Sequence, residues 1–563
     1  MKIIKYEANL ENYGAMSLDC DLVKGAVMSE EKDGALFINV DCECQFEPYD
    51  YTRVFQRYGS VVITAEVDDV EKILAQRIKS PFWAGPEFAD DFTAIPDRTQ
   101  ALLVKNDKGY KFIYALANGD FQTTIRSGKK ENQLEICINK IAPDTTKAKG
   151  TALISVDGEN PYELIRRGFE ILEEEKLINV QLKKYKKYPE TLNYLGWCTW
   201  NAFYHDVTED GIIGKMEEFR EKGIPVRWVL IDDGWSEYND DMTLRSIYED
   251  KTKFPGGLKQ TVKILKEKYG VLSVGAWHSA TGYWKGTDFS DETTIGTPQG
   301  IEVPAGYEFY SKWHTYLKEQ GIDFVKVDCQ GNIWEYMQNN RNSLPAVIKA
   351  QQGLDKAAAE SFEFMINCMG MVNINMLNRN DSVMCRNSDD FFPLDKESLE
   401  NHVKQNVYNA LFNDYLYYCD FDMWWSKHFQ AAQNGVLRAI SGGPFYLSDK
   451  TGDSEAEVIK MFVDENGRIN RYDHAAKPTL DCVCGIDKVL KVFNNRGNDG
   501  VVATFTFKEG GKCTVSAADF GGEGTYLVKE KLSGEEFTLN KGEAFECSMS
   551  DHEVRMYEFT KVE

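Results

Sequence analysis

The 563-residue sequence lacks the apolar runs that mark secreted or membrane proteins. Its first residues, MKIIKYEANLENYG, have no apolar core of a signal peptide. No segment reaches the roughly 18 consecutive apolar residues of a membrane-spanning helix. The 13 cysteines are scattered, and the close pairs Cys42/Cys44 and Cys482/Cys484 do not have zinc-finger spacing. We therefore expect a cytoplasmic protein with reduced thiols.

Positive charge is also scarce. Lysine and arginine number 65 against 89 aspartates and glutamates, which gives a net charge of −24. Because nucleic acids and anionic membranes are polyanions, this excess disfavours both as partners. The sequence has no H-E-x-x-H motif, no cluster at metal-ligand spacing, no Walker loop and no G-x-S-x-G elbow. We therefore expect neither a metal nor a cofactor.

The sequence divides into three zones with different residue patterns, and this division predicts a multidomain protein. Residues 1–185 contain alternating runs such as GSVVITAEV and NQLEICINKI, which are typical of an N-terminal β-sandwich. A helix should close this zone, with Asn160 as its N-cap before Pro161. Residues 479–563 return to alternating runs and predict a C-terminal antiparallel β-domain, again of sandwich type.

The central zone, residues 186–478, follows a different pattern. Short apolar segments alternate there with longer amphipathic stretches, such as TEDGIIGKMEEFREKG and GLKQTVKILKEKYG. Eight segments qualify as buried strands: YLGWCTW, VRWVLIDDGW, LSVGAWHS, DFVKVDCQ, FMINCM, SVMCRNSDDF, LYYCDFDMW and ISGGPFYLSD. Eight strands alternating with helices predict a (β/α)₈ barrel, or TIM barrel.

Polar and aromatic residues gather where these predicted strands end. Active sites of such barrels lie at the carboxyl ends of the strands. A single strand-end carboxylate could simply cap a loop, but several charges on one rim repel each other unless a function holds them there. The candidates are Trp197, Asp232, Asp233, Trp277, Lys326, Asp328, Cys368, Arg386 and Asp390.

These residue types suit a sugar substrate. Indole rings stack on the apolar face of a pyranose, and carboxylates and amines bind its hydroxyl groups. Two carboxylates are the minimal set for cleaving a glycosidic bond, and Asp328 and Asp390 follow predicted strands four and six. Lys326 shares a strand face with Asp328 and should keep it ionised, as a nucleophile requires. Arg386 could bind a hydroxyl group or orient the acid.

Several motifs together resemble a known family. LGWCTWNAF, VLIDDGW, GAWHSATGYW, VKVDCQ and RNSDDFFP resemble the barrel motifs of glycoside hydrolase family 36, the α-galactosidase type. Within that family they are most similar to the branch of raffinose synthases and seed imbibition proteins. The segments PFWAGPEF (81–88) and IPDRTQALLVK (95–105) extend the resemblance into the N-terminal zone.

The resemblance implies a role for each carboxylate. Asp328 corresponds to the family's nucleophile and Asp390 to its acid/base, whereas the neighbouring Asp389 would cap or position the loop. Asp232 and Asp233 would bind the 4- and 6-hydroxyl groups of galactose. The implied mechanism is double displacement through a β-linked galactosyl-enzyme, with net retention of the α-anomer.

The resemblance also implies binding residues. Lys326 and Arg386 would bind ring hydroxyl groups, and Trp197, Trp277 and Trp83 would form stacking walls. For Trp83 the alternative is an aromatic side chain in the core of the sandwich. The segment NCMGMVNIN around Cys368 departs from the family pattern near the sugar's 2-position, which leaves galactose and N-acetylgalactosamine both open.

The sequence thus predicts a retaining exo-glycosidase that hydrolyses terminal α-linked galactose from oligosaccharides or glycoconjugates. Because the chain is shorter than the plant synthases, water is favoured over a sugar as acceptor. The alternatives are an α-N-acetylgalactosaminidase, an α-galactosyltransferase of the raffinose synthase type, and a catalytically silent sugar-binding protein. The expected partner is a small carbohydrate, and homo-oligomerisation stays open.

Overall fold

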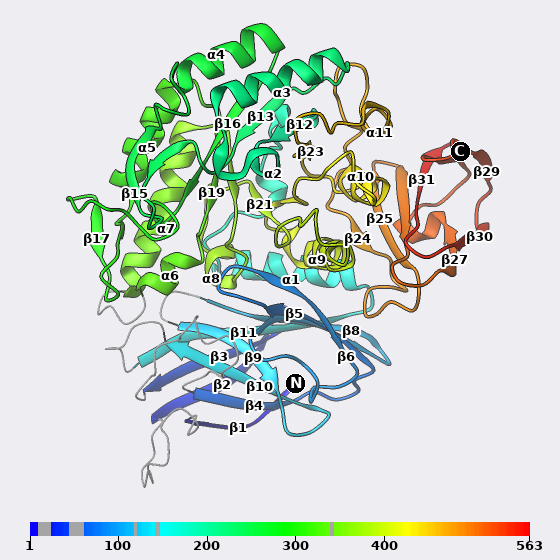
Figure 1. Cartoon of the computed structure of the whole chain (residues 1–563). Helices are drawn as coiled ribbons and strands as arrows, with labels where there is room; N and C mark the ends of the chain where they lie inside the picture. Colours follow the sequence, from blue (N-terminus) through cyan, green and yellow to red (C-terminus); the bar gives the residue numbers. More distant parts are fainter. Residues whose placement is uncertain (9–23, 44–60, 118–120, 141–146, 338–342, 563) are drawn as a thin grey trace.

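The structure is a computed structural model that describes residues 1–8, 24–43, 61–117, 121–140, 147–337 and 343–562. An N-terminal antiparallel β-domain, a central parallel barrel and a C-terminal antiparallel β-domain follow one another along the chain (Figure 1). The predicted fold class is therefore confirmed. The division at residues 185 and 478 stays a proposal.

The N-terminal domain is a single hydrogen-bonded network of antiparallel strands. Its main path runs β1-β4-β10-β9-β7-β8-β11-β3-β2, and β5 joins β6 to β7. The strands are β1 Lys2–Ala8, β2 Lys24–Lys32, β3 Ala35–Glu43, β4 Val61–Glu66, β5 Lys72–Ile78, β6 Ala84–Ala89, β7 Thr99–Asn106, β8 Gly109–Ala115, β9 Phe121–Ser127, β10 Gln133–Lys140 and β11 Lys147–Gly158.

Strand β7 shows why parts of this domain have continuous rather than alternating hydrophobicity. Leu102 and Val104 face the interior of the domain, whereas Ala101 and Leu103 belong to the core shared with the barrel. Successive side chains of a strand point to opposite faces, so a strand buried on both faces has no polar face. The domain is thus packed against the barrel through a second apolar surface.

Helix α1 (Pro161–Glu174) lies between the N-terminal sheet and the barrel (Figure 1). The side chain of Asn160 accepts hydrogen bonds from the backbone N–H groups of Tyr162 and Glu163, which confirms the predicted N-cap. The ring of Phe169 contacts Phe112 of the sheet and Tyr415 of the barrel, with centroid distances of 5.9 Å in both cases. The helix therefore joins the two domains through its apolar face.

The barrel contains eight parallel strands in sequential order, as the sequence predicted. A bridge between Trp424 and Leu447 links the chain after the seventh strand to the eighth and closes the ring. The strands are β12 Gly196–Cys198, β13 Trp228–Ile231, β16 Ser273–Ser279, β19 Phe324–Asp328, β20 Met365–Asn367, β21 Met384–Arg386, β22 Tyr418–Asp420 and β23 Tyr446–Leu447.

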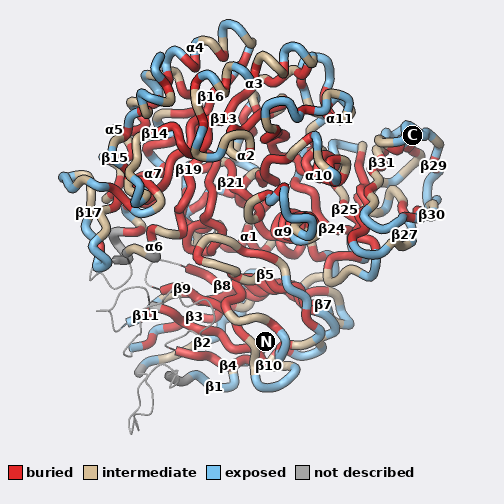
Figure 2. The backbone as a smooth tube through the Cα atoms, in the orientation of Figure 1, coloured by how far each residue is buried: buried red, intermediate tan, exposed pale blue. Residues whose placement is uncertain are grey.

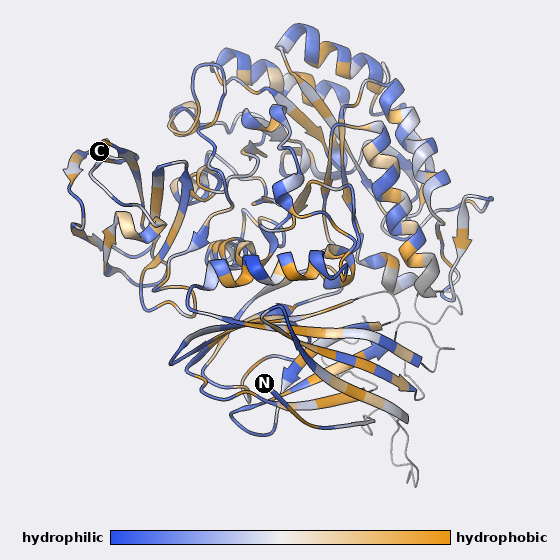
Figure 3. Cartoon of the chain, turned by 180° about the vertical axis from the view of Figure 1, so that it is seen from behind, coloured by the Kyte–Doolittle hydropathy of each residue, from blue (hydrophilic) through white to orange (hydrophobic). Residues whose placement is uncertain are grey.

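Helices and hairpins surround these strands. The longer helices are α3 Glu209–Glu221, α4 Leu258–Tyr269, α5 Tyr307–Glu319, α7 Ser343–Ser361, α9 Ser398–Asn413 and α10 Ala431–Ala439. The short helices are α2 Trp200–Phe203, α6 Asn332–Met337, α8 Asn373–Met376 and α11 Ala456–Lys460, and the hairpins are β14 Ser236–Tyr238 with β15 Leu244–Glu249 and β17 Thr294–Gly296 with β18 Glu302–Pro304. Figures 2 and 3 show buried, apolar strands inside an outer layer of helices with exposed, hydrophilic faces.

The C-terminal domain is a six-stranded antiparallel sheet with a separate two-stranded pair. The sheet runs β24 Lys477–Pro478, β25 Leu490–Arg496, β26 Asp499–Phe505, β31 Val554–Lys561, β28 Tyr526–Glu530 and β29 Glu536–Leu539, and the pair is β27 Gly511–Ser516 with β30 Ala544–Met549. Residues of both, including Val502, Phe559 and Cys547, share one apolar cluster.

Membrane-spanning helices and metal sites are two features that bear on function. Within the described residues, no helix combines the length and apolar character needed to cross a membrane. The same part of the chain holds no group of three or more His, Cys, Asp or Glu side chains placed to bind a metal ion.

Candidate active site

Asp232 follows β13 and lies at the centre of a buried polar group. Its Oδ2 accepts hydrogen bonds from Lys326 Nζ at 2.9 Å and from Cys198 Sγ at 3.2 Å. Its Oδ1 accepts one from the backbone N–H of Asp233 at 2.9 Å. Burial of the Lys326 ammonium opposes its charge, but the Asp232 carboxylate and other acidic neighbours raise the pKa of Lys326 overall. This ion pair joins strands two and four at the barrel mouth.

The Asp233 carboxylate also has three protein partners. Its Oδ1 accepts a hydrogen bond from the Tyr283 hydroxyl group at 2.7 Å, and its Oδ2 accepts one from Trp284 Nε1 at 2.7 Å. Oδ2 also lies 3.0 Å from His205 Nε2. Only 1% of the residue is exposed. Protein donors thus hold both strand-two carboxylates in place.

Asp328 ends β19 and is buried. Its Oδ2 accepts a hydrogen bond from Trp277 Nε1 at 3.0 Å. Burial raises the pKa of Asp328, the Lys326 ammonium lowers it, and the Asp390 carboxyl group raises it. Lys326 thus favours the ionised form of Asp328, but burial outweighs it and the pKa of Asp328 is raised overall; the direct ion pair of Lys326 is with Asp232.

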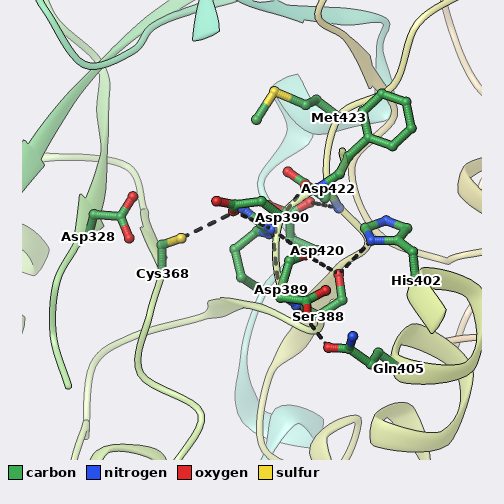
Figure 4. A network of polar contacts seen from close by, with 12 residues as sticks. Asp328, Cys368, Ser388, Asp389, Asp390, His402, Gln405, Asp420, Asp422 and Met423 are labelled. Carbon is green, nitrogen blue, oxygen red and sulfur yellow. Dashed lines mark hydrogen bonds and ion pairs between the residues drawn. The ribbon is translucent and has the colours of Figure 1, made fainter. Parts of the chain in front are cut away.

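Asp390 lies beyond the end of β21 and keeps 45% of its side-chain surface exposed. Arg386 Nη2 lies 3.2 Å from its Oδ1. Desolvation within the surrounding protein raises the pKa of Asp390, the Arg386 guanidinium opposes this, and Asp422 adds to it. Figure 4 shows Cys368 between the carboxyl groups of Asp328 and Asp390. A carboxyl group with a raised pKa suits a proton donor.

Arg386 is the buried cation that organises this side of the mouth. Its Nη2 lies 2.9 Å from Asp422 Oδ2, and both side chains are fully buried. Nη2 also donates to the backbone oxygen of Asp389 at 2.9 Å, and Nη1 donates to Cys368 Sγ at 3.6 Å. These contacts favour the orienting role that the sequence analysis left open for Arg386. They also place Cys368 beside the two carboxylates.

Helix α9 anchors the segment that carries Asp390 (Figure 4). Gln405 Oε1 accepts a hydrogen bond from the backbone N–H of Asp389 at 3.1 Å. His402 Nδ1 lies 3.5 Å from Ser388 Oγ, which donates to the backbone oxygen of Asp389 at 2.8 Å. The Asp389 carboxylate pairs with Lys79 of the N-terminal domain at 3.4 Å. Asp389 therefore lies between domains, in keeping with a positioning role.

The segment 79–84 of the N-terminal domain reaches the barrel mouth. The Arg386 guanidinium lies 5.6 Å from the centre of the Trp83 ring, within cation–π range. The backbone oxygen of Phe82 accepts a hydrogen bond from the N–H of Met371 at 3.0 Å. Phe82 and Trp83 also pack with Cys329, Cys368, Met369 and Trp284. Trp83 therefore lies at the barrel mouth and outside the core of the sandwich, and its role as a wall of a sugar pocket stays a prediction.

Buried amides fix this segment to the barrel. Gln76 Nε2 donates to Asn409 Oδ1 at 3.0 Å, and Gln100 Nε2 donates to Gln76 Oε1 at 3.0 Å. Asn409 Nδ2 donates at 2.9 Å to the backbone oxygens of both Ala84 and Asn387. The side-chain amide of Asn409 on α9 thus binds both the segment that carries Trp83 and the segment that carries Asp390.

Trp197 is not brought to this site. The residue is fully buried, and its ring packs against Phe203 and Phe219 at centroid distances of 6.1 Å and 5.8 Å. Phe219 belongs to α3, so the ring lies between the strand and the helices. The next residue, Cys198, contacts Asp232 instead. Because strand side chains alternate, the inward position on β12 belongs to Cys198, and the predicted stacking role of Trp197 is corrected.

Two side chains of the third strand, Trp277 and His278, have different surroundings. Trp277 is 1% exposed and donates to Asp328, so it holds the carboxylate in addition to contacting Trp284. His278 is fully buried, its Nε2 lies 2.9 Å from His314 Nε2, and burial lowers the pKa of His278 to about 4. His278 is therefore a core residue.

Trp284 is a site residue that the sequence analysis did not assign. It is half-buried, stacks near Trp277 with centroids 6.1 Å apart, and donates to Asp233. It also packs in the cluster that contains Trp83. Its signal was present, since it is the last residue of the motif GAWHSATGYW, but it lies beyond the predicted strand end. Trp83 and Trp284 are thus two half-buried indoles at the mouth.

The family comparison agrees with this geometry. The model of a family described as raffinose synthase or seed imbibition protein Sip1 matches residues 77–253 and 295–520. The chain belongs to this family. The resemblance identified from the motifs is therefore confirmed, and the matched ranges include Asp328 and Asp390.

Curated members of the raffinose synthase family are moderately similar. A probable galactinol–sucrose galactosyltransferase 6 from Arabidopsis thaliana is 28% identical over 494 residues, which cover 75% of this chain and 66% of that protein. The stachyose synthase of Pisum sativum is 23% identical over 580 residues, covering 76% and 67%. The chain spans about two thirds of the length of the curated relatives it matches.

Solved structures show the same fold. A variant of the GH36 α-galactosidase AgaA from Geobacillus stearothermophilus, in complex with raffinose, superposes with a TM-score of 0.60 at 12% identity. The match covers 96% of this chain and 81% of that one. The galactosidase domain of the α-galactosidase–sucrose kinase AgaSK gives a TM-score of 0.59 at 13% identity, covering 96% and 80%.

Proposed function

We propose that this protein transfers an α-galactosyl group from an α-galactoside to a sugar hydroxyl group, with retention of configuration. The observation that carries the proposal is the Asp328/Asp390 pair, two carboxylates separated by Cys368 at the mouth of one barrel (Figure 4). The proposed substrates are carbohydrates such as galactinol and sucrose, which the names of curated relatives contain.

In the first step the Asp328 carboxylate attacks the anomeric carbon and the glycosidic bond breaks. Asp390 gives its proton to the departing oxygen, so the leaving group departs as a neutral alcohol. In the second step Asp390, now ionised, removes the proton of an incoming hydroxyl group as that oxygen attacks the anomeric carbon and displaces Asp328. Two inversions give net retention.

The electrostatics support this division of roles. Burial raises the pKa of Asp328, but Lys326 and the Trp277 N–H oppose this shift and favour the ionised form that a nucleophile requires. The Asp390 carboxyl group also raises the pKa of Asp328, because like charges resist joint ionisation. Lys326 paired with Asp232 and the bonded Asp233 carboxylate would offer fixed partners for sugar hydroxyl groups.

The acceptor is the point on which the sequence analysis and the comparisons differ. The sequence analysis placed hydrolysis first and transfer as an alternative. The relatives are named galactosyltransferases and stachyose synthase, which favours the transferase alternative and galactose at the donor site. Water would still compete for the same galactosyl-enzyme, because Asp390 is half-exposed.

The test is to incubate the protein with galactinol, with and without sucrose, and to follow products by anion-exchange chromatography and proton NMR. We expect an α-linked galactosyl-sucrose that accumulates with sucrose concentration, and no product from the Asp328→Asn variant. Release of galactose alone at every sucrose concentration would reject transfer in favour of hydrolysis. Binding of galactinol without turnover would indicate the silent sugar-binding alternative.

A further inference from the structure

Large apolar side chains are exposed on the rim directly after Asp390. Phe392 is 52% exposed and Leu394 is 77% exposed, both on the segment between β21 and α9. Phe429, which follows β22, is 59% exposed. We call these three residues the rim patch. Single exposed apolar residues are common on protein surfaces. The rim patch therefore indicates a binding surface only through its position beside Asp390.

The rim patch is built on an anchored backbone. Phe391 is buried between Asp390 and Phe392, and its N–H donates to Asp422 Oδ2 at 2.7 Å. The Arg438 guanidinium lies 5.5 Å from the centre of the Phe391 ring. The exposed Phe392 is therefore fixed, through its neighbour, to the same buried network that holds Arg386 beside Asp390.

The two segments of the rim patch are also tied to each other. His428 Nε2 lies 2.8 Å from the backbone oxygen of Pro393. The His428 ring lies 5.9 Å from the Phe391 ring and 4.3 Å from the Phe429 ring, measured between centroids. Lys396 Nζ lies 5.9 Å from the centre of the Phe429 ring. Phe392 and Phe429 thus belong to one connected rim beside the proposed acid/base.

We propose that Phe392 and Phe429 form the platform on which the acceptor saccharide stacks. This inference rests on the proposed function. The oxygen that leaves and the oxygen that enters must both come within hydrogen-bond reach of Asp390. Since the buried Asp232 and Asp328 hold the donor galactose, the ring that carries this oxygen lies on the exposed side of Asp390, where the rim patch begins.

The chemistry of the rim patch suits a neutral sugar. Phenyl rings offer flat apolar surface to the C–H face of a pyranose or furanose, and Lys396 offers a donor for its hydroxyl groups. Pro393 separates Phe392 from Leu394, and the charged residues Asp395 and Lys396 follow Leu394. Stable protein interfaces bury about 800 Å² per partner, for which three side chains provide too little area.

The experiment compares Phe392→Ala, Phe429→Ala and the double variant with the unaltered enzyme. Initial rates of transfer and hydrolysis are measured with galactinol at increasing sucrose. We expect the double variant to require roughly tenfold more sucrose for equal transfer, because an aromatic stacking contact is worth about one factor of ten. Its ratio of transfer to hydrolysis should fall accordingly, with an unchanged melting temperature.

The matched control is Tyr185→Ala, which removes a 62% exposed aromatic residue from the short helix Lys183–Tyr185, ahead of the first barrel strand. This control should keep both rates. An unchanged sucrose dependence in the double variant would reject the acceptor platform but not the proposed function. A change in its sedimentation coefficient would also reject the platform, because it would identify a contact between copies of the chain. Absence of transfer by the unaltered enzyme instead overturns the proposed function.

Discussion

The two sides of the barrel mouth differ in how completely their carboxylates are bonded. On the strand-two side, Asp232 and Asp233 are at most 2% exposed and accept hydrogen bonds from several protein donors. On the strand-six side, Asp390 is 45% exposed and its ion pair is with Arg386. A fully bonded polar network is rigid, whereas a half-exposed carboxyl group can exchange partners.

This difference matches the two halves of the proposed transfer reaction. The galactosyl group stays bound through both steps, so its side of the site benefits from fixed partners. The leaving group and the acceptor must replace each other, so their side has to remain open. The comparison predicts that substitutions on the bonded side affect every substrate, whereas those on the open side affect substrates unequally.

The largest effect is expected for Asp328→Asn. The amide preserves the size of the side chain and the contact with Trp277, but it cannot form the galactosyl-enzyme. Turnover of all donors should fall by roughly 10⁴-fold or more, as for other nucleophile losses. Initial rates with galactinol and with p-nitrophenyl α-galactoside measure this. The exposed Asp453→Asn is the control; comparable activity of both variants would reject Asp328 as the nucleophile.

Asp390→Ala should lower turnover less than Asp328→Asn does, and by different factors for substrates with different leaving groups. Loss of general acid catalysis costs roughly 10² to 10⁴ with a poor leaving group such as inositol. A p-nitrophenolate group needs little protonation, so the galactosyl-enzyme should still form and show as a burst of p-nitrophenol. Asp389→Ala is the matched control, since its carboxylate pairs with Lys79. If Asp389→Ala shows the burst and Asp390→Ala does not, the assignment is one residue off.

Trp83 and Trp197 provide an internal contrast between a rim indole and a core indole. Trp83→Ala removes a half-buried ring beside Arg386, so kcat/KM should fall about tenfold with little change in stability. Trp197→Ala empties space under α3 and should lower the free energy of unfolding by about 3 to 5 kcal/mol.

Chemical denaturation and steady-state kinetics of both variants test the contrast. Trp83→Phe serves as the conservative control and should recover part of the activity. A large loss of stability from Trp83→Ala with normal kinetics would place the pocket in the barrel alone.

Much of the fold could be predicted from sequence because the barrel repeats one pattern. Each strand is apolar, short and followed by polar residues, so all eight were located, together with Asp328 and Asp390 at the ends of two of them. The orientation of Trp197 could not be predicted, because β12 is three residues long and apolar on both faces. No alternation distinguishes the inward Cys198 from the outward Trp197.

The hydrogen-bond and ion-pair partners of the site residues were harder to predict from the sequence than the orientation of Trp197. Lys326 precedes Asp328 by two residues, which suggested a direct pair, but the barrel places Asp232 of strand two nearer. The donors to Asp233 come from residues 205, 283 and 284, which only the folded loops bring together. Sequence spacing predicts which side chains share a rim, whereas hydrogen-bond partners depend on the loops above it.

The smallest effect concerns the pH dependence of the bonded side. The hydrogen bond that the His205 ring donates to Asp233 raises the pKa of His205 above its usual value, against the effect of partial burial. A raised pKa in the folded state stabilises the protein below the unfolded value of about 6.5, and this stabilisation is lost as pH rises through the folded pKa. His205→Gln keeps an amide donor for Asp233 but does not titrate. The difference in melting temperature between the two proteins should therefore shrink between about pH 6 and pH 8, and titrations elsewhere cancel because both proteins share them. A difference that stays constant over this range would show that folding leaves the pKa of His205 unchanged, which would contradict the stabilising contact with Asp233.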